Sequence, residues 1–483
     1  MKTRREWFSL AGIALGGVML SNCSPASPSA PLAVIAHNRA AFGPRPGELE
    51  GFDFPDFVES QLHPGQIDDR ACERKLSRLS TLTKSFQQLY REHWDEVSDE
   101  PSDEEWAWLE LPYHQTVQAT FLRALYSRRQ LQEVLADFWH NHFSVYGQHE
   151  EILPLLPAYD RDAIRPHLLG NFRAMLGAVA SHPVMAIYLD NRSNDLSGPN
   201  QNYARELLEL HTLGAFHYQG SRDPHMVARG DQGVAVAYVD NDVLEVARCF
   251  TGWAVDEEDG RFGFEPSWHD RSNKLVLGRY LPRDGRDVDA VLDLLAEHPA
   301  TARHVALKLC RRLVADDPPP DLVTRIADVF WTQRGRDDQL RQVVRAILLS
   351  SEFAQTWGAK RKRPFEFTVS LLRALEVETD AIPDDFLALY DRMGQPLFGR
   401  PSPDGYPDRA EAWQHAGSIL LRWQLVRGLL EGDLDLSVDL APGRDWTERL
   451  LGRPSHHQEL LQGLSSPREV VALLALGAEF QMR

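Results

Sequence analysis

The segment LADFWHNHFSVYG, residues 135–147, places two histidines on either side of an asparagine. Histidine can bind a metal or transfer a proton near neutral pH, so His140 and His142 are the first candidates for chemistry. Residues two positions apart on a helix point about 200° apart, however, so these imidazoles converge only if the helix ends between them. The letters HNH also mark a nuclease class, but that class needs a ββα metal fold with wider spacing. We therefore expect His142 to face the helix predicted at residues 199–216, and His140 to support the end of its own helix.

The segment PNQNYARELLELHTLGAF, residues 199–216, predicts a helix with two carboxylates on one face. Glu206 and Glu209 are three positions apart, as in helical sites where carboxylates share a cation. The alternative is an exposed face on which Arg205 pairs with Glu209. His211 falls on the apolar side, where a lone histidine is expected to be a core residue. Because the two glutamates share one turn and do not face each other across a groove, cleavage of a glycan by a carboxylate pair is the least favoured function.

A third polar group lies in residues 250–278, where His269 and Asp270 are neighbours and Lys274 follows four residues later. An aspartate beside a histidine can orient it as a base or as a metal ligand. The alternative is a loop histidine next to a turn-forming aspartate. The sequence leaves both interpretations open.

The elements that would position these residues are mostly helical. Apolar residues recur at three- and four-residue spacing in six further segments, which are residues 116–139, 162–180, 300–316, 321–333, 339–353 and 364–377. Only two stretches look like strands, residues 233–240 and 274–281, and no strand alternates with helices. The predicted fold is therefore mainly α, a large multi-helix domain with a small β-hairpin insert and a helical C-terminal subdomain. A polar break at residues 377–385 suggests a main domain at 34–380 and a subdomain at 381–483.

The N-terminal residues have the pattern of an export signal. A basic start precedes an apolar stretch that is too short to span a membrane, so residues 1–22 are predicted to be a signal peptide. The letters TRREWF at residues 3–8 are typical of twin-arginine export, and Cys23 stands where a lipoprotein would be acylated. Asn22 is atypical before such a cysteine, which leaves lipidation open. Residues 23–33 are predicted to be a flexible tether.

Charge and cysteine usage limit the possible partners. The net charge is −18, which argues against a nucleic-acid binder because such a protein needs a basic face. Any membrane association is expected only through the signal or a lipid at Cys23, and the expected location is the periplasm or cell envelope. Cys72, Cys249 and Cys310 have no paired spacing, so three buried thiols are favoured over one disulfide and a free thiol.

Several segments together are more specific than any one alone. FWHNHFSV, IRPHLLGNFRAMLGAVASHPVMAIYLDN, PNQNYARELLELHTLG, RCFTGW, WHDRSNKLVLG and GQPLFGRPSPDGYP occur in this order. Over residues 34–430 and toward the end, the chain resembles the bacterial family called domain of unknown function eighteen-hundred. The resemblance implies an exported, mostly helical protein, often encoded beside a sulfatase-like exported partner, and it carries over no reaction. The matching motif positions are His140, Asn141, His142, Asn202, Arg205, Glu206, Glu209, His211, Thr251, Trp253, His269, Asp270 and Lys274. The chain departs at Gln201, where the family has glutamate.

Two hypotheses follow. In the first, the protein is a metal-dependent periplasmic enzyme that uses Zn, Fe or Mn. Its predicted metal ligands are His142, Glu206, Glu209 and His269, and its predicted catalytic residues are His140, Asp270 and Lys274. In the second, it is a non-catalytic helical binding or adaptor protein that works with the sulfatase-like partner. The polar groups would then be buried networks that fix the packing of the helices.

Overall fold

The computed structural model describes residues 30–98, 100–256, 258–282, 286–464 and 466–483. Within them the fold is mainly α with small β-hairpins, as the periodicity predicts. The predicted signal peptide and Cys23 lie outside the described residues. The helix α2 begins at Leu32, so the predicted tether to residue 33 overlaps its first turn. Among the described helices, none combines the length and the hydrophobicity that crossing a bilayer requires.

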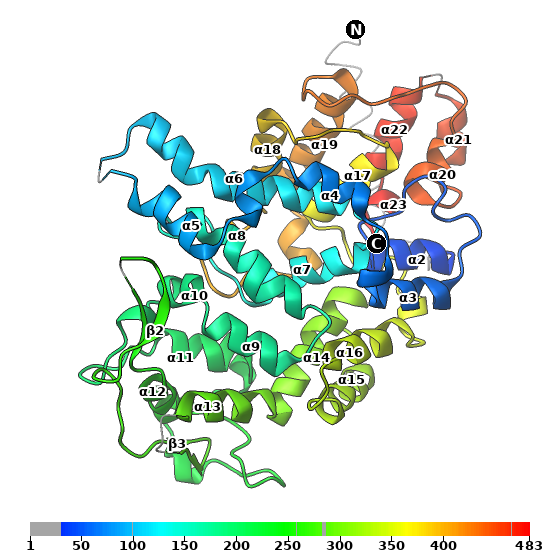
Figure 1. Cartoon of the computed structure of the whole chain (residues 1–483). Helices are drawn as coiled ribbons and strands as arrows, with labels where there is room; N and C mark the ends of the chain where they lie inside the picture. The colour runs from blue at the N-terminus through cyan, green and yellow to red at the C-terminus, as the bar shows by residue number, and fades with distance from the viewer. Residues whose placement is uncertain (1–29, 99, 257, 283–285, 465) are drawn as a thin grey trace.

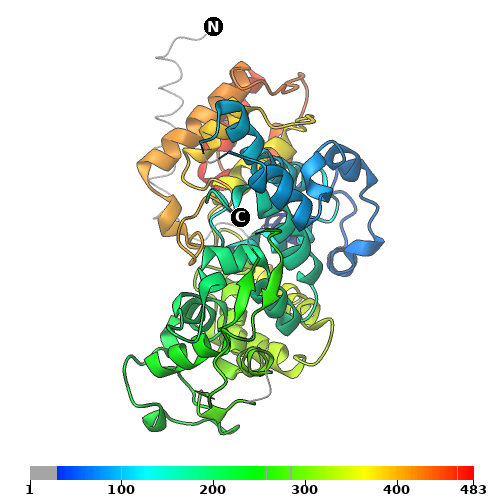
Figure 2. The same cartoon turned by 60° about the vertical axis from the view of Figure 1, so that its left-hand side comes forward.

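The molecule has two helical parts, stacked one above the other in Figures 1 and 2. The upper part joins both ends of the described chain. It contains α2 (Leu32–Arg39), α3 (Phe54–Leu62), α4 (Arg70–Leu76), α5 (Phe86–Tyr90), α6 (Asp103–Tyr126), α7 (Gln130–His142), α8 (Leu156–Ala158), α17 (Pro364–Ala374), α18 (Asp384–Asp391), α19 (Ala416–Glu431), α20 (Trp446–Leu451), α21 (Gln458–Gln462), α22 (Pro467–Leu476) and α23 (Ala478–Gln481).

The lower part is built from the middle of the chain. It contains α9 (Phe172–Ala180), α10 (Pro183–Tyr188), α11 (Asn202–Glu206), α12 (Asp240–Cys249), α13 (Asp287–Ala296), α14 (Pro299–Leu313), α15 (Pro320–Thr332) and α16 (Gln339–Leu348). Two π-helical turns carry residues of the sequence motifs or their partners, η6 (Tyr159–Ile164) and η9 (Leu207–His211). Such turns are rare and concentrate at functional sites.

The β structure is small, as predicted, but its strands differ from the predicted ones. Residues 274–281, predicted as a single strand, form a hairpin of β3 (Leu275–Val276) and β4 (Arg279–Tyr280). Residues 233–240 are not a strand; they run as an irregular segment with isolated bridges at Ala235 and Tyr238. Most of their apolar residues are buried all the same, whereas Val236 is exposed, and Ala235 donates a backbone hydrogen bond to Leu277 in the hairpin. A second hairpin, which the sequence did not indicate, pairs β1 (Trp253–Val255) with β2 (Phe262–Phe264).

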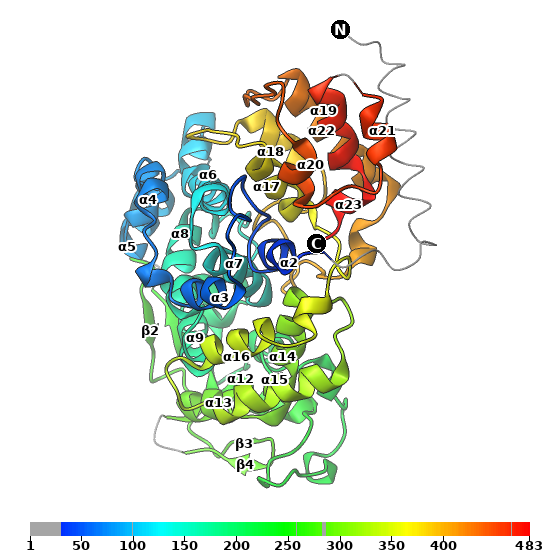
Figure 3. The same cartoon turned by 90° about the vertical axis from the view of Figure 1, so that its right-hand side faces the viewer.

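The C-terminal helices surround α17. Helices α18 and α20 both contact α17, and α19 and α22 pack beside them in the upper part of the molecule (Figure 3). The predicted boundary at residue 380 therefore falls between two helices in contact, and it stays a prediction. The three described cysteines, Cys72, Cys249 and Cys310, are free and buried, as the sequence favours.

A buried network of ion pairs joins the two parts. Arg312, at the end of α14, pairs with Asp137 on α7 at 2.9 Å and with Glu366 on α17. Arg363 pairs with the same two carboxylates, and the last residue, Arg483, reaches Glu366 at 2.8 Å. Burial would raise the pKa of Glu366, but the three guanidinium groups hold it well below its usual value. Glu366 is thus ionised and central to the junction of α7, α14 and α17.

Replacing Glu366 with glutamine should destabilise the protein strongly, because it leaves three buried guanidinium groups without their shared carboxylate. We expect the free energy of unfolding to fall by about 3–5 kcal/mol, measured by urea denaturation. Glu352→Gln is the matched control, since Glu352 pairs with Arg325 at the surface and its loss should cost at most about 1 kcal/mol. Equal effects of the two substitutions would contradict a central role for Glu366.

Candidate functional site

The predicted catalytic residue His140 lies on the last turn of α7 and is held by an aspartate. Its Nε2 lies 2.8 Å from Asp160, which also receives a 2.7 Å bond from Arg165 and one of 3.2 Å from Arg123. Burial would raise the pKa of Asp160, but Arg165, His140 and Arg123 hold it far below its usual value. Arg165 is shared with Glu133 of α7 at 3.0 Å. His140 is therefore one member of a paired network that fixes α7 against the π-helical turn η6.

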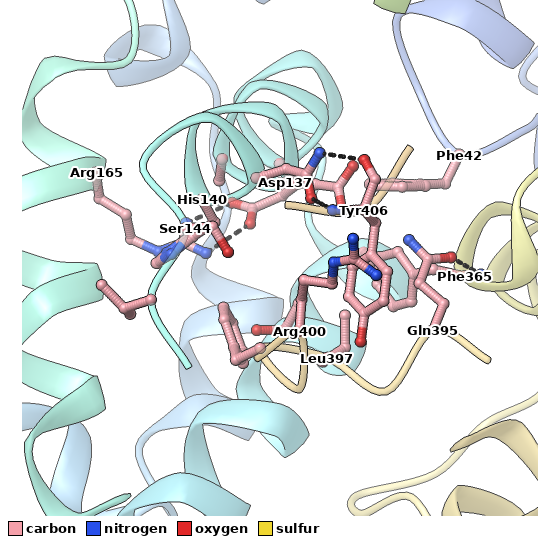
Figure 4. A pocket seen from close by; sticks show the side chains of 17 residues that line it. Phe42, Asp137, His140, Ser144, Arg165, Phe365, Gln395, Leu397, Arg400 and Tyr406 are labelled. Atoms are coloured by element: carbon pink, nitrogen blue, oxygen red, sulfur yellow. Dashed lines mark hydrogen bonds and ion pairs between the residues drawn. The ribbon is translucent and has the colours of Figure 1, made fainter. Parts of the chain in front are cut away.

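The network borders a small cavity of about 50 Å³, drawn in Figure 4. Figure 4 shows His140 and Arg165 on one side of this cavity and Tyr406 and Gln395 on the other. The neighbouring Asn141 also lines it, and its side-chain amide exchanges two hydrogen bonds with the backbone of Tyr406, at 2.6 and 2.8 Å. The cavity has room for a few water molecules and no more.

Asn141 also explains a glycine in the facing loop. Gly405 has φ +71°, and a Cβ built there would lie 2.2 Å from the carbonyl oxygen of Asn141. Only glycine allows the two backbones to approach this closely. The motif segments containing Asn141 and Gly405 thus fit together as one contact between α7 and the loop at residues 396–408.

His142 lies against the end of the helix predicted at residues 199–216, where its side chain contacts the backbone. Its Nε2 lies 3.1 Å from the carbonyl oxygen of His211, and its ring centroid is 6.2 Å from that of His211 and 6.1 Å from that of His304. His304 in turn approaches the carbonyl oxygen of Leu210 with its Nε2, at 3.0 Å. We call His142, His211, His304 and the nearby Lys308 the lysine–histidine cluster. It lies where α7, η9 and α14 meet.

The histidines of the cluster are held neutral. Burial, and then the charge of Lys308, lower the pKa of His304 to about 4 and that of His211 to about 3. The same two causes place the pKa of His142 well below its usual value. Nδ1 of His142 and both ring nitrogens of His211 are buried without a hydrogen-bond partner in the described chain. Burial lowers the pKa of Lys308 to about 8, against the attraction of Asp408.

The two predicted carboxylate ligands lie on the exposed side of the same helix. Glu206 ends α11, Glu209 lies in η9, and both are half-buried. Within the described chain neither has a hydrogen bond or ion pair, and Arg205 pairs with Asp240 at 3.6 Å, away from Glu209. Burial, followed by the charge of Glu209, raises the pKa of Glu206. Gln201 stands at the N-cap of α11 without a side-chain cap, and the side chain of Asn200 accepts a hydrogen bond from the backbone N–H of Asn202.

The third polar group holds the β-hairpins in place. Nδ1 of His269 lies 2.8 Å from the carbonyl oxygen of Thr251, and its Nε2 lies 3.4 Å from Asp287. Lys274 pairs with Asp287 at 2.6 Å, and both side chains are buried. Asp270 is bonded at 2.7 Å by Arg248, and burial would raise its pKa, but hydrogen bonds from Arg248 and Ser272 hold it far below its usual value. These groups are paired with protein partners.

The structure therefore distributes the predicted site over three places. His140 is in the Asp160 network, His142 is in the lysine–histidine cluster beside the Glu206 helix, and His269 is with Asp270 and Lys274 behind the hairpins. In the part of the chain that is described, no group of three or more His, Cys, Asp or Glu side chains is arranged to hold a metal ion. The four predicted ligands do not share a centre, and a divalent metal stays a prediction.

Sequence analysis missed His304 and Lys308. They are one turn apart on α14, next to the buried Val305 and Leu309. Two polar residues at i and i+4 along the apolar side of an amphipathic helix were the available signal. The pattern alone did not show that His142 and His211, which are distant in sequence, pack against them.

The chain was also compared with known proteins. A family model described as a protein of unknown function, DUF1800, matches residues 35–482. The chain belongs to this family. The match covers nearly the whole chain, which confirms the resemblance seen in the motifs. No curated protein and no solved structure matched.

The lysine–histidine cluster predicts a loss of stability in acid. The unfolded chain binds protons at histidine near pH 6.5, whereas folded His304 and His211 bind them only near pH 4 and pH 3. Stability should therefore fall as the pH falls from about 6.5 toward 4, as measured by urea denaturation at pH 7 and pH 5. His304→Gln should reduce this difference, and His225→Gln, at an exposed histidine, should not. An unchanged difference in His304→Gln would contradict the neutral, buried state of His304.

Proposed function

We propose that this chain is an exported, non-catalytic binding protein of the bacterial envelope. It docks a protein partner through the segment at residues 196–280. The proposal rests on one observation about exposed apolar side chains. Of the thirteen large hydrophobic residues exposed in the described chain, eight belong to this segment: Leu196, Phe216, Tyr218, Met226, Val236, Phe264, Trp268 and Tyr280. We call these eight residues the apolar surface.

The segment that carries the apolar surface belongs to the lower part of the molecule (Figures 1 and 2). Within it, the backbone N–H of Leu196 donates a hydrogen bond to the carbonyl oxygen of Trp268, at 2.9 Å. His217, next to Phe216, contacts the backbone of Val236 at 3.1 Å. Exposed apolar side chains gathered in one region mark interaction sites, and aromatic residues and methionine are enriched in the centres of protein interfaces.

The polar motif residues support this surface from behind. His269 and Lys274 pair with Asp287, and Asp270 pairs with Arg248. These contacts fix the region that exposes Phe264, Trp268 and Tyr280. Groups that are buried and paired with charged protein neighbours favour a structural role over a reactive one. This supports the second hypothesis from the sequence over the metal-dependent enzyme.

The occupant that we propose is the sulfatase-like exported protein that the family resemblance suggests. The proposed location is the periplasm or cell envelope, after export by the twin-arginine route, with a lipid at Cys23 as an open alternative to a free protein. Neither nucleic acid nor a bilayer is proposed as a ligand of the apolar surface.

The docking surface is tested by removing its most exposed residues. Phe216 is 95% exposed and Tyr280 is 75% exposed, so Phe216→Ser and Tyr280→Ser should leave the fold unchanged. Each should weaken binding of the sulfatase-like protein about tenfold or more, measured by titration calorimetry, because aromatic anchors dominate interface energies. Leu420→Ser removes a 52% exposed leucine on α19, outside the surface, and is the control. Unchanged affinity in both surface variants would overturn the proposal.

A further inference from the structure

Two cations on α14, Lys308 and Arg311, lie outside the apolar surface. Lys308 has no hydrogen bond or ion pair within the described residues. Arg311, three residues later, uses its Nε to bond the carbonyl oxygen of Asp316 at 3.0 Å, and its guanidinium group has no ion pair in the same part of the chain. Residues three apart on a helix lie on one face, so the two positive groups are neighbours.

The carboxylates nearby are already paired. Asp408 lies against Lys360 and Arg363, and Asp404 pairs with Arg400 at 3.1 Å. Asp317 pairs with Arg409 at 2.5 Å, and Asp316 pairs with Lys360 at 2.5 Å. These four acidic groups are paired with other cations, and no carboxylate of the described residues forms an ion pair with Lys308 or Arg311.

The surroundings of Lys308 favour the binding of an anion. Lys308 is enclosed by protein, although part of its side chain reaches solvent. The imidazoles around it are neutral, and the ring of His211 is fully buried with both nitrogens free. Lys308 and Arg311 are both partly exposed, and together they offer several N–H donors that solvent can reach. Two neighbouring cations of this kind are suited to a carboxylate, sulfate or phosphate group.

We propose that Lys308 and Arg311 form an oxyanion-binding site, which takes a carboxylate, sulfate or phosphate group of a small ligand. The site lies between the two helical parts, next to the loop at residues 396–408. It is separate from the apolar surface, so it does not depend on the proposed docking function.

Binding is tested with three simple anions. Inorganic phosphate, sulfate and acetate are titrated calorimetrically into the full-length protein, against chloride at equal ionic strength. At least one of the three should bind, and which of them binds identifies the class of ligand. Lys308→Met and Arg311→Gln should each weaken that binding about tenfold or more, since each removes a charged hydrogen-bond donor. Arg325→Gln removes one positive charge from an ion pair on α15 and should change the affinity less than twofold.

A second measurement follows the amine itself. Trace acylation with acetic anhydride near pH 8, read by mass spectrometry, should label Lys308 several-fold more slowly when the bound anion is present. Lys84, which pairs with Glu92 at 2.7 Å, is the internal reference and should be labelled at an unchanged rate. Failure of all three anions to bind would overturn the proposal. The proposal would also be overturned if both α14 variants bound the anion as tightly as the unsubstituted protein does, or if the anion did not change the labelling rate of Lys308.

Discussion

The junction between the two helical parts depends on the ion pairs of Arg312. Its guanidinium group, which is almost completely buried, extends from the last turn of α14 to carboxylates on α7 and α17. A buried cation needs its partners, since an unpaired one costs several kcal/mol. The positions of α7, α14 and α17 are therefore coupled. The C-terminal Arg483 adds to the same constraint, because it donates to the carbonyl oxygen of Arg312 and pairs with Glu366.

Once α7 and α14 are fixed, the three consecutive residues at the end of α7 take separate roles. His140 points to Asp160 on η6, Asn141 points to the loop that contains Gly405, and His142 points to η9 and α14. Each contacts a different segment, which explains why polar residues stand together at the end of an amphipathic helix. The family motif in this part of the chain is thus a structural connection between segments that are distant in sequence. Lys308 and Arg311, which form no ion pair within the described residues, lie beside it on α14.

The sequence was sufficient to predict those features that depend on a local pattern of residues. Periodicity predicted the helices, the resemblance predicted the family, and the spacing of His140 and His142 predicted that they diverge. Pairings across the chain could not be obtained this way: His140 meets an aspartate in a π-helical turn, and Lys274 meets Asp287, whose position only the fold defines. The same limit applies to the metal ligands. Their residue types were suitable, but no local rule shows whether His269 and Glu206 converge.

Hydrogen–deuterium exchange of the protein, alone and with the proposed sulfatase-like partner, most directly tests whether the motif residues support a docking surface. The account predicts that the partner slows exchange in peptides spanning residues 214–238 and 262–280, with little change at the end of α7. Protection centred on residues 135–147 or 199–211, with none in the apolar surface, would contradict it.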